Sequence, residues 1–144
     1  MATMIFVNLP VKDLNRSIEF YTKLGYSQNL DFSNEQGACI VISETIFVML
    51  LTEDFYQTFT NKPIANTSQT SAVINCLSAN SRDHVDELLN NAFSAGATKP
   101  KEMMEMPGMY GGSFYDPDGH HWEVMYMEPY AVAGQEKPAE VAQA

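Results

Sequence analysis

Basic residues are scarce in this chain of 144 residues, which has eight Lys and Arg, eighteen Asp and Glu, and a net charge of −10. Nucleic-acid binding needs Lys and Arg gathered against phosphate, whereas here they are scattered along the sequence. No apolar run approaches the roughly 20 residues of a membrane span. The first residues also lack the basic region and long apolar stretch of a secretory signal. We therefore expect no nucleic-acid partner, no membrane partner and a cytoplasmic location.

Cysteine is also rare, with one residue in each half of the chain. Cys39 and Cys76 lie inside apolar, strand-like runs, and their separation is far from the close spacing of paired zinc ligands. Free buried thiols are common in cytosolic proteins, and we interpret both residues in this way. A disulfide joining the two halves is the alternative, because pairing depends on geometry that the sequence does not give.

The two halves share one order of elements. Residues 8–14 and 75–81 both begin at Asn within an apolar strand-like run, and in both stretches this run ends in Asp or Asn, the usual N-cap of a helix. A helix and then three short strand-like runs follow in each half. A repeat of about 65 residues indicates one supersecondary unit that is used twice, with a concave surface between the two copies.

Periodicity and turn residues place the individual elements. Asp13 should cap a helix that stops at Gly25, and Asn80 or Ser81 should cap a second helix that stops at Gly96. Strands are expected at residues 4–11, 26–32, 38–43 and 46–51, and then at 71–78, 98–101, 110–115 and 122–126. A short helix is expected within 53–59, and a flexible loop beside a pocket at 107–112.

These elements divide a single domain, residues 1–144, into four parts. Module one spans about 4–52, a polar connection about 53–70 and module two about 71–128. Residues 129–144 form a tail that is rich in Ala, Glu and Gln, and we expect it to carry no chemistry.

The last strand is preceded by the turn sequence Asp116-Pro117-Asp118-Gly119. Asp accepts hydrogen bonds from nearby backbone, Pro presets φ, and Gly permits positive φ. Alternation along the strand that follows puts His121, Glu123 and Met125 on one face, and His120, Trp122 and Val124 on the other.

Two motifs in this order resemble the vicinal oxygen chelate superfamily. They are Leu9-Pro10-Val11-Lys12-Asp13-Leu14-Asn15-Arg16-Ser17-Ile18-Glu19-Phe20-Tyr21 and Phe114-Tyr115-Asp116-Pro117-Asp118-Gly119-His120-His121-Trp122-Glu123. That superfamily includes glyoxalase I, bleomycin- and fosfomycin-resistance proteins, extradiol dioxygenases and methylmalonyl-CoA epimerase. The resemblance implies an α+β fold with two βαβββ modules in one chain, an open, barrel-like mixed sheet around a cleft, and helices outside. It also implies a homodimer.

Metal-using members hold one divalent ion with His or carboxylate groups from facing strands, and the resemblance locates those positions here. They fall at Phe6, at Met49 or Leu50, at Val73 or Ile74, and at Glu123. Only Glu123 is a ligand for a hard cation. The prediction is therefore that no metal or other cofactor is present; if a divalent metal binds, Glu123 and His121 are the candidate ligands. We interpret His84, in the first turn of the second helix, as a solvated side chain.

The resulting prediction is a glyoxalase/bleomycin-resistance-like protein that binds a small organic molecule in the cleft between the modules. Glu123 is the candidate catalytic residue, and pairing with His121 would ease its burial. The candidate ligand-binding residues are Phe6, Asn8, Met49, Ile74, Cys76, Tyr110, Tyr115, His121 and Met125. One alternative is a metal-dependent, lactoylglutathione-lyase-like enzyme with Glu123 as metal ligand or proton-transfer base. An extradiol dioxygenase is disfavoured, because the chain has only three His and two of them are adjacent. An interaction protein with a filled barrel is the third alternative.

Overall fold

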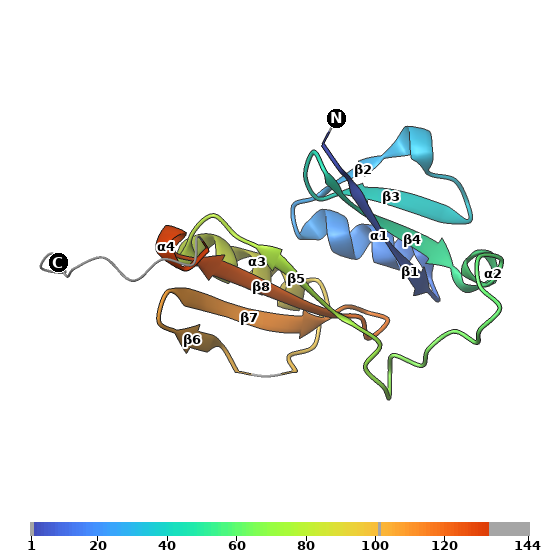
Figure 1. Ribbon diagram of the computed structural model, residues 1–144. Helices are drawn as coiled ribbons and strands as arrows, with labels where there is room; N and C mark the ends of the chain where they lie inside the picture. Colours follow the sequence, from blue (N-terminus) through green and yellow to red (C-terminus); the bar gives the residue numbers. More distant parts are fainter. Residues whose placement is uncertain (1, 101, 133–144) are drawn as a thin grey trace, which may run out of the picture.

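The computed structural model describes residues 2–100 and 102–132 as two modules with the same order of elements (Figure 1). Module one contains β1 (Ile5–Val11), α1 (Leu14–Lys23), β2 (Ser27–Asn29), a 3₁₀ turn (Leu30–Phe32), β3 (Gly37–Val41) and β4 (Ile46–Thr52). Helix α2 (Glu53–Gln57) begins the connection. Module two contains β5 (Ile74–Ser78), α3 (Arg82–Ser94), β6 (Met104–Met106), β7 (Met109–Tyr115), β8 (His121–Met127) and α4 (Pro129–Val132).

Each module forms a separate four-stranded mixed sheet. Sheet 1 has the order β1-β4-β3-β2 and sheet 2 the order β5-β8-β7-β6. In both sheets the first strand of the module pairs in parallel with its last strand, and the other pairs are antiparallel. The predicted α+β fold of two βαβββ units is therefore confirmed, and so is the internal repeat.

Both long helices begin where the sequence predicts. The Asp13 side chain accepts a hydrogen bond from the Arg16 backbone N–H, and the Ser81 hydroxyl accepts one from His84 N–H. Each cap satisfies a backbone donor that a helix start leaves unpaired. Because His84 Nδ1 also accepts a hydrogen bond from the backbone N–H of Asn80, this histidine serves to close the start of α3.

Strand boundaries differ from the prediction where the strand signals are weak. Of the expected strand at 98–101, the described residues 98–100 form only a single bridge, between Thr98 and Tyr115, and β6 lies at Met104–Met106. The expected loop at 107–112 is mostly β7, since only Pro107 and Gly108 turn the chain. The first four residues of the predicted tail form α4, and residues 133–144 lie outside the described residues.

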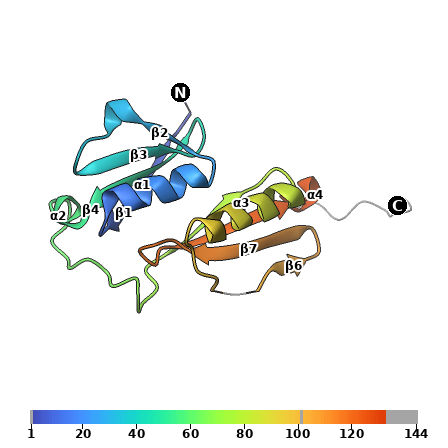
Figure 2. The ribbon, with the colours of Figure 1, turned by 180° about the vertical axis from the view of Figure 1, so that it is seen from behind.

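Helices α1 and α3 lie on the same side of the molecule, behind the sheets in Figure 1 and in front of them in Figure 2. They contact each other, and the residues of both modules form one hydrophobic core. The sheets are not closed into a barrel, and the two helices lie outside them, each with one face buried in the shared core. Within the described part of the chain, no helix is both long and apolar enough to span a bilayer.

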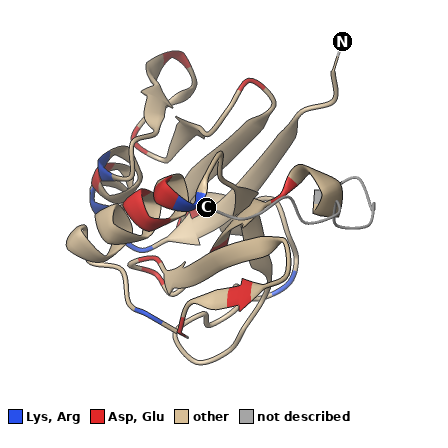
Figure 3. Cartoon of the chain, turned by 90° about the vertical axis from the view of Figure 1, so that its left-hand side faces the viewer, with Lys and Arg blue, Asp and Glu red and all other residues tan. Residues whose placement is uncertain are grey.

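We call the face of each sheet that turns away from α1 or α3 its open face. Phe6 is 50% exposed and Ile74 is 49% exposed, although both are large apolar residues inside strands. The charged residues in Figure 3 lie mainly on helices and loops, so the strands are mostly uncharged. Large exposed apolar surface of this kind is typical of binding surfaces.

Candidate functional site

The four metal-ligand positions implied by the superfamily resemblance all lie on the open faces. In sheet 1, Phe6 pairs with Phe47 and Asn8 pairs with Met49. In sheet 2, Ile74 pairs with His121 and Cys76 pairs with Glu123. This register selects Met49 over Leu50 and Ile74 over Val73, because Leu50 is buried in the core and Val73 precedes β5.

The two open faces are related by the internal repeat, and this relation shows how they differ. Phe6 corresponds to Ile74, and Met49 corresponds to Glu123. Phe6 and Phe47 stack with ring centroids 4.9 Å apart, which makes sheet 1 aromatic at this point. Sheet 2 carries polar groups at the matching rows.

Glu123 lies between two small polar side chains. Its register partners are Cys76 on β5 and Ser113 on β7. Partial desolvation by its neighbours raises the pKa of the Cys76 thiol although the residue is exposed, and the negative charge of Glu123 raises it further, so this thiol stays protonated near neutral pH. The expectation that Cys76 is buried was wrong: it is exposed on the open face, and both it and Cys39 are free thiols.

His121 does not pair with Glu123 as expected. Its ring packs edge-on against Tyr115, with centroids 5.0 Å apart, and its buried Nε2 has no hydrogen-bond partner among the residues that the structure describes. The imidazole therefore lies against a side chain of the neighbouring strand β7. An unpaired buried nitrogen is costly unless a further group or water meets it.

Eight of the nine predicted ligand-binding residues lie on the open faces. They are Phe6, Asn8 and Met49 on sheet 1, and Ile74, Cys76, Tyr115, His121 and Met125 on sheet 2. Tyr110 does not join them. It lies on the helix side of β7, where its hydroxyl donates to Asp86 and the Arg82 guanidinium lies over its ring. The prediction misplaced it because it treated residue 110 as part of a loop.

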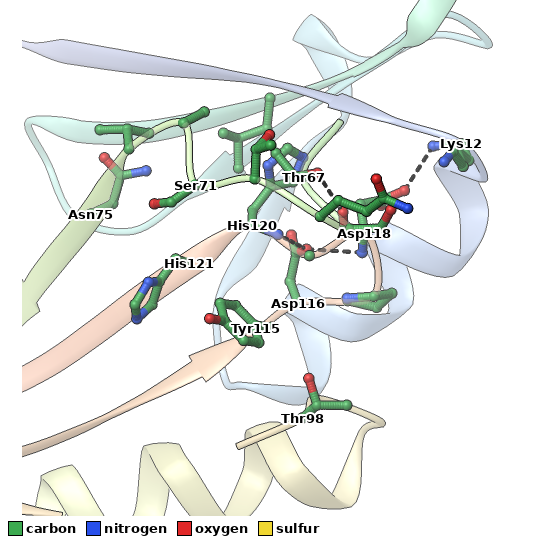
Figure 4. A pocket seen from close by; sticks show the side chains of 18 of the residues that line it. Lys12, Thr67, Ser71, Asn75, Thr98, Tyr115, Asp116, Asp118, His120 and His121 are labelled. Atoms are coloured by element: carbon green, nitrogen blue, oxygen red, sulfur yellow. Dashed lines mark hydrogen bonds between the residues drawn. The ribbon is translucent and has the colours of Figure 1, made fainter. Parts of the chain in front are cut away.

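A pocket of about 630 Å³ adjoins this surface at the junction of the modules (Figure 4). The connection at residues 67–73, the turn at 115–121 and the start of α1 form its walls. Polar and apolar atoms share its lining about equally, and only Tyr115 and His121 among the predicted site residues reach it. These two side chains therefore join the pocket to the open face of sheet 2.

The closing turn, residues 116–119, forms the main polar contact between the modules. The sequence motif indicated only a turn and did not predict this contact. Asp118 accepts hydrogen bonds from the Lys12 backbone N–H at 3.0 Å and from the Ser17 hydroxyl at 3.2 Å. Arg16 lies 3.4 Å from the same carboxylate. His120 Nε2 lies 2.7 Å from the Pro10 carbonyl oxygen, and a ring N–H at this position donates to it.

A second, buried part of this contact centres on Asp116. Its carboxylate accepts a hydrogen bond of 2.6 Å from the Tyr21 hydroxyl, and the Trp122 indole N–H donates to the same hydroxyl at 3.0 Å. Burial raises the pKa of Asp116, although His120 and the hydrogen bonds from the Tyr21 hydroxyl and from the backbone N–H groups of Asp118 and His120 oppose the rise. Burial and the adjacent Asp116 raise the pKa of Tyr21 well above its usual value.

A hard divalent cation does not fit the donor set at the superfamily's ligand positions. Three of the four positions hold a phenyl ring, a thioether and an aliphatic chain, none of which such an ion selects. Among the residues that the structure describes, no group of three or more His, Cys, Asp or Glu side chains converges to hold a metal. We therefore derive no chemical step through such an ion.

Comparison with known proteins agrees with the fold and the motifs. Residues 3–43 match the sequence model of the bleomycin resistance protein-like N-terminal family. No curated protein matches the sequence. A hypothetical protein, SA1046 from S. aureus, has 28% sequence identity and a TM-score of 0.73, covering 88% of this chain and 94% of that chain.

Two further solved structures have names that describe a function. A glyoxalase/bleomycin resistance protein/dioxygenase family enzyme from Burkholderia phytofirmans PsJN has 16% identity and a TM-score of 0.72, covering 88% of this chain and 99% of that chain. A lactoylglutathione lyase from Agrobacterium tumefaciens has 19% identity and a TM-score of 0.67, covering 94% of this chain and 99% of that chain. At this identity, both comparisons show the fold alone. The comparisons therefore show a fold shared with solved proteins that are named glyoxalase, bleomycin resistance protein or dioxygenase, and a sequence match to a bleomycin resistance protein-like family over the first module.

Proposed function

We propose that this protein binds a small aromatic or apolar organic molecule on the open faces of its sheets, without a divalent metal. The observation that carries the proposal is the replacement of three superfamily ligand positions by Phe6, Met49 and Ile74, with exposed apolar surface around them. Ligand sites combine such apolar walls with a few polar groups, here Glu123 and His121.

The same proposal includes a homodimer. Both open faces turn to the side opposite α1 and α3, and the described residues of one chain leave Phe6 and Ile74 exposed on them. A homodimer that brings sheet 1 of one copy against sheet 2 of the other would enclose the ligand. Analytical ultracentrifugation across a range of concentrations tests this assembly: a species of twice the chain mass supports it, and a monomer throughout contradicts it.

Ligand binding is tested with Nile red, an uncharged aromatic dye whose fluorescence rises in apolar surroundings, in buffer that contains EDTA. We expect saturable binding that Phe6→Ala weakens by about tenfold, since the substitution removes most of an exposed aromatic contact. The matched control is Leu30→Ala. It truncates an exposed apolar residue in the 3₁₀ turn that follows β2, outside the strands of sheet 1. Equal binding by wild type and Phe6→Ala would contradict the proposed surface.

The alternative function is a metal-dependent lyase, and Glu123 is the observation that favours it. It is a carboxylate at a superfamily ligand position, on an accessible sheet face. The assay follows conversion of the hemithioacetal of methylglyoxal and glutathione after addition of Ni²⁺ or Zn²⁺. Turnover that Glu123→Gln abolishes would replace the binding proposal with this one; no turnover with either metal leaves binding as the function.

A further inference from the structure

Methionine is concentrated at one end of sheet 2. The chain has nine methionines, and five of them lie together on the open face of three neighbouring strands. We call them the thioether cluster: Met104 and Met106 on β6, Met109 on β7, and Met125 and Met127 on β8.

The strand register arranges the cluster in two rows. In the first row, Met106 lies opposite Met109, and Met109 lies opposite Met127. Side chains that are directly opposite on one face have Cβ atoms about 4.5–5.5 Å apart, so the Met109 thioether is within reach of Met106 on one side and of Met127 on the other. The row crosses three strands without another residue type between them.

The second row has a glycine between its two methionines. Met104 and Met125 both lie opposite Gly111, which has no side chain to separate them. A Cβ atom built on Gly111 would collide with the Met125 sulfur, so this thioether lies directly over the glycine. The second row therefore brings two more sulfur atoms beside the first.

The cluster is not an extension of the hydrophobic core. None of its residues belongs to the core cluster that both modules share. Met125 is only 4% exposed, whereas Met106, at the sheet edge, is 51% exposed. Other methionines are placed differently: Met103 lies beside Gly112 and Leu89 on the helix side, and Met49 lies on sheet 1.

Thioether sulfur is a neutral, polarisable donor that binds soft cations and leaves hard ones to oxygen ligands. The net charge of −10 also attracts cations in general. We propose that the thioether cluster binds a soft monovalent ion, Cu(I), through the sulfur atoms of Met106, Met109 and Met127. Met104 and Met125 lie in the adjacent row as further donors. This inference is independent of the organic ligand proposed above.

The test is an anaerobic Cu(I) titration of the full chain in competition with bicinchoninate. We expect one bound ion per chain, with an affinity that falls about tenfold or more for each thioether that Met→Leu removes at residues 106, 109 and 127. Leu keeps the size and apolar character of Met, so the fold should persist, as far-UV circular dichroism would verify. Met103→Leu is the matched control, since it changes a neighbouring residue on the other face.

A second measurement identifies the donors directly. With Ag(I) as a diamagnetic substitute and ¹³C-labelled methionine methyl groups, the signals of the cluster should shift while those of Met49 and Met103 stay in place. Because thiolates also bind Cu(I), Cys39→Ser and Cys76→Ser are included and should keep wild-type affinity. Unchanged affinity in the triple Leu variant, or loss of binding in either Ser variant, would overturn the proposal.

Discussion

At the residue scale, Tyr21 shows how one polar group can join two modules. Its hydroxyl donates to Asp116 and accepts from Trp122, and all three side chains are buried in the shared core. Helix α1 supplies the tyrosine from module one, whereas both partners belong to module two. A buried network of this kind stabilises a structure only while each member keeps its partners.

Replacing Tyr21 with Phe should destabilise the protein by about 1–3 kcal/mol, because the buried Asp116 Oδ2 and the Trp122 N–H each lose their hydrogen bond to the Tyr21 hydroxyl. The measurement is urea unfolding of wild type and variant at neutral pH. Thr22→Val, on the adjacent exposed turn of α1, removes a hydroxyl that bonds only its own helix and should cost much less. Equal losses in the two variants would show that the network contributes nothing.

The same residue predicts a pH dependence. Burial raises the pKa of Tyr21 well above its usual value, so the folded protein keeps this proton at a pH where the unfolded chain has lost it. The stability that depends on this group is complete below about pH 10 and is lost as the pH rises above that value. Wild type should therefore lose stability more steeply than Tyr21→Phe between pH 9 and about 11. Parallel curves would contradict the assignment; some slope remains in the variant because the pKa of Tyr26 and of Tyr110 is also raised.

At the element scale, the inner strands β3 and β7 each contain a glycine at the same position of the repeat. Gly37 lies opposite Leu51, and Gly111 lies opposite Met125. A Cβ at Gly37 would meet the Leu51 side chain at 2.9 Å, and one at Gly111 would meet both Met125 and the backbone oxygen of Val124. In both sheets, the glycine has no side chain, so the side chain opposite it on the neighbouring strand can lie over β3 or β7.

Gly111→Ala should therefore lower the free energy of unfolding by about 1–3 kcal/mol, as overpacking does in tightly filled sites. Thermal unfolding followed by circular dichroism measures the change. Adding Met125→Ala should restore only part of the loss, since the Val124 carbonyl oxygen still meets the new methyl group. Full recovery in the double variant would show that only the methionine side chain resists the substitution.

Local sequence patterns predicted most helices and strands, but they could not predict contacts between residues that are far apart in the sequence. The caps at Asp13 and Ser81 and the alternation along β8 depend on residues that are close in sequence. The bond from Tyr21 to Asp116 joins residues that are 95 positions apart, and nothing in either local sequence indicates it. Tyr110 was misplaced for a related reason, because its face depends on a register with β8 that the sequence leaves open.

At the scale of the whole molecule, the modules are structural repeats but not separate cores. The hydrophobic cluster runs from Val48 and Leu50 in sheet 1 through both helices to Val124 in sheet 2. The contacts of Asp118 with the start of α1 add a polar join at the edge of this core. A chain that buries its apolar residues in one cluster is expected to unfold in one cooperative transition.

This cooperativity can be tested because the chain has a single tryptophan, Trp122, in module two. Val48→Ala in module one removes two fully buried methyl groups and should cost about 2 kcal/mol. If one core holds both modules, the urea midpoint of Trp122 fluorescence will fall by the same amount as the midpoint of far-UV circular dichroism. If the modules unfold separately, the fluorescence midpoint will stay in place while the circular dichroism curve divides into two steps. We expect coincident curves, because Trp122 bonds the hydroxyl of Tyr21 and so loses its surroundings whenever α1 leaves the core.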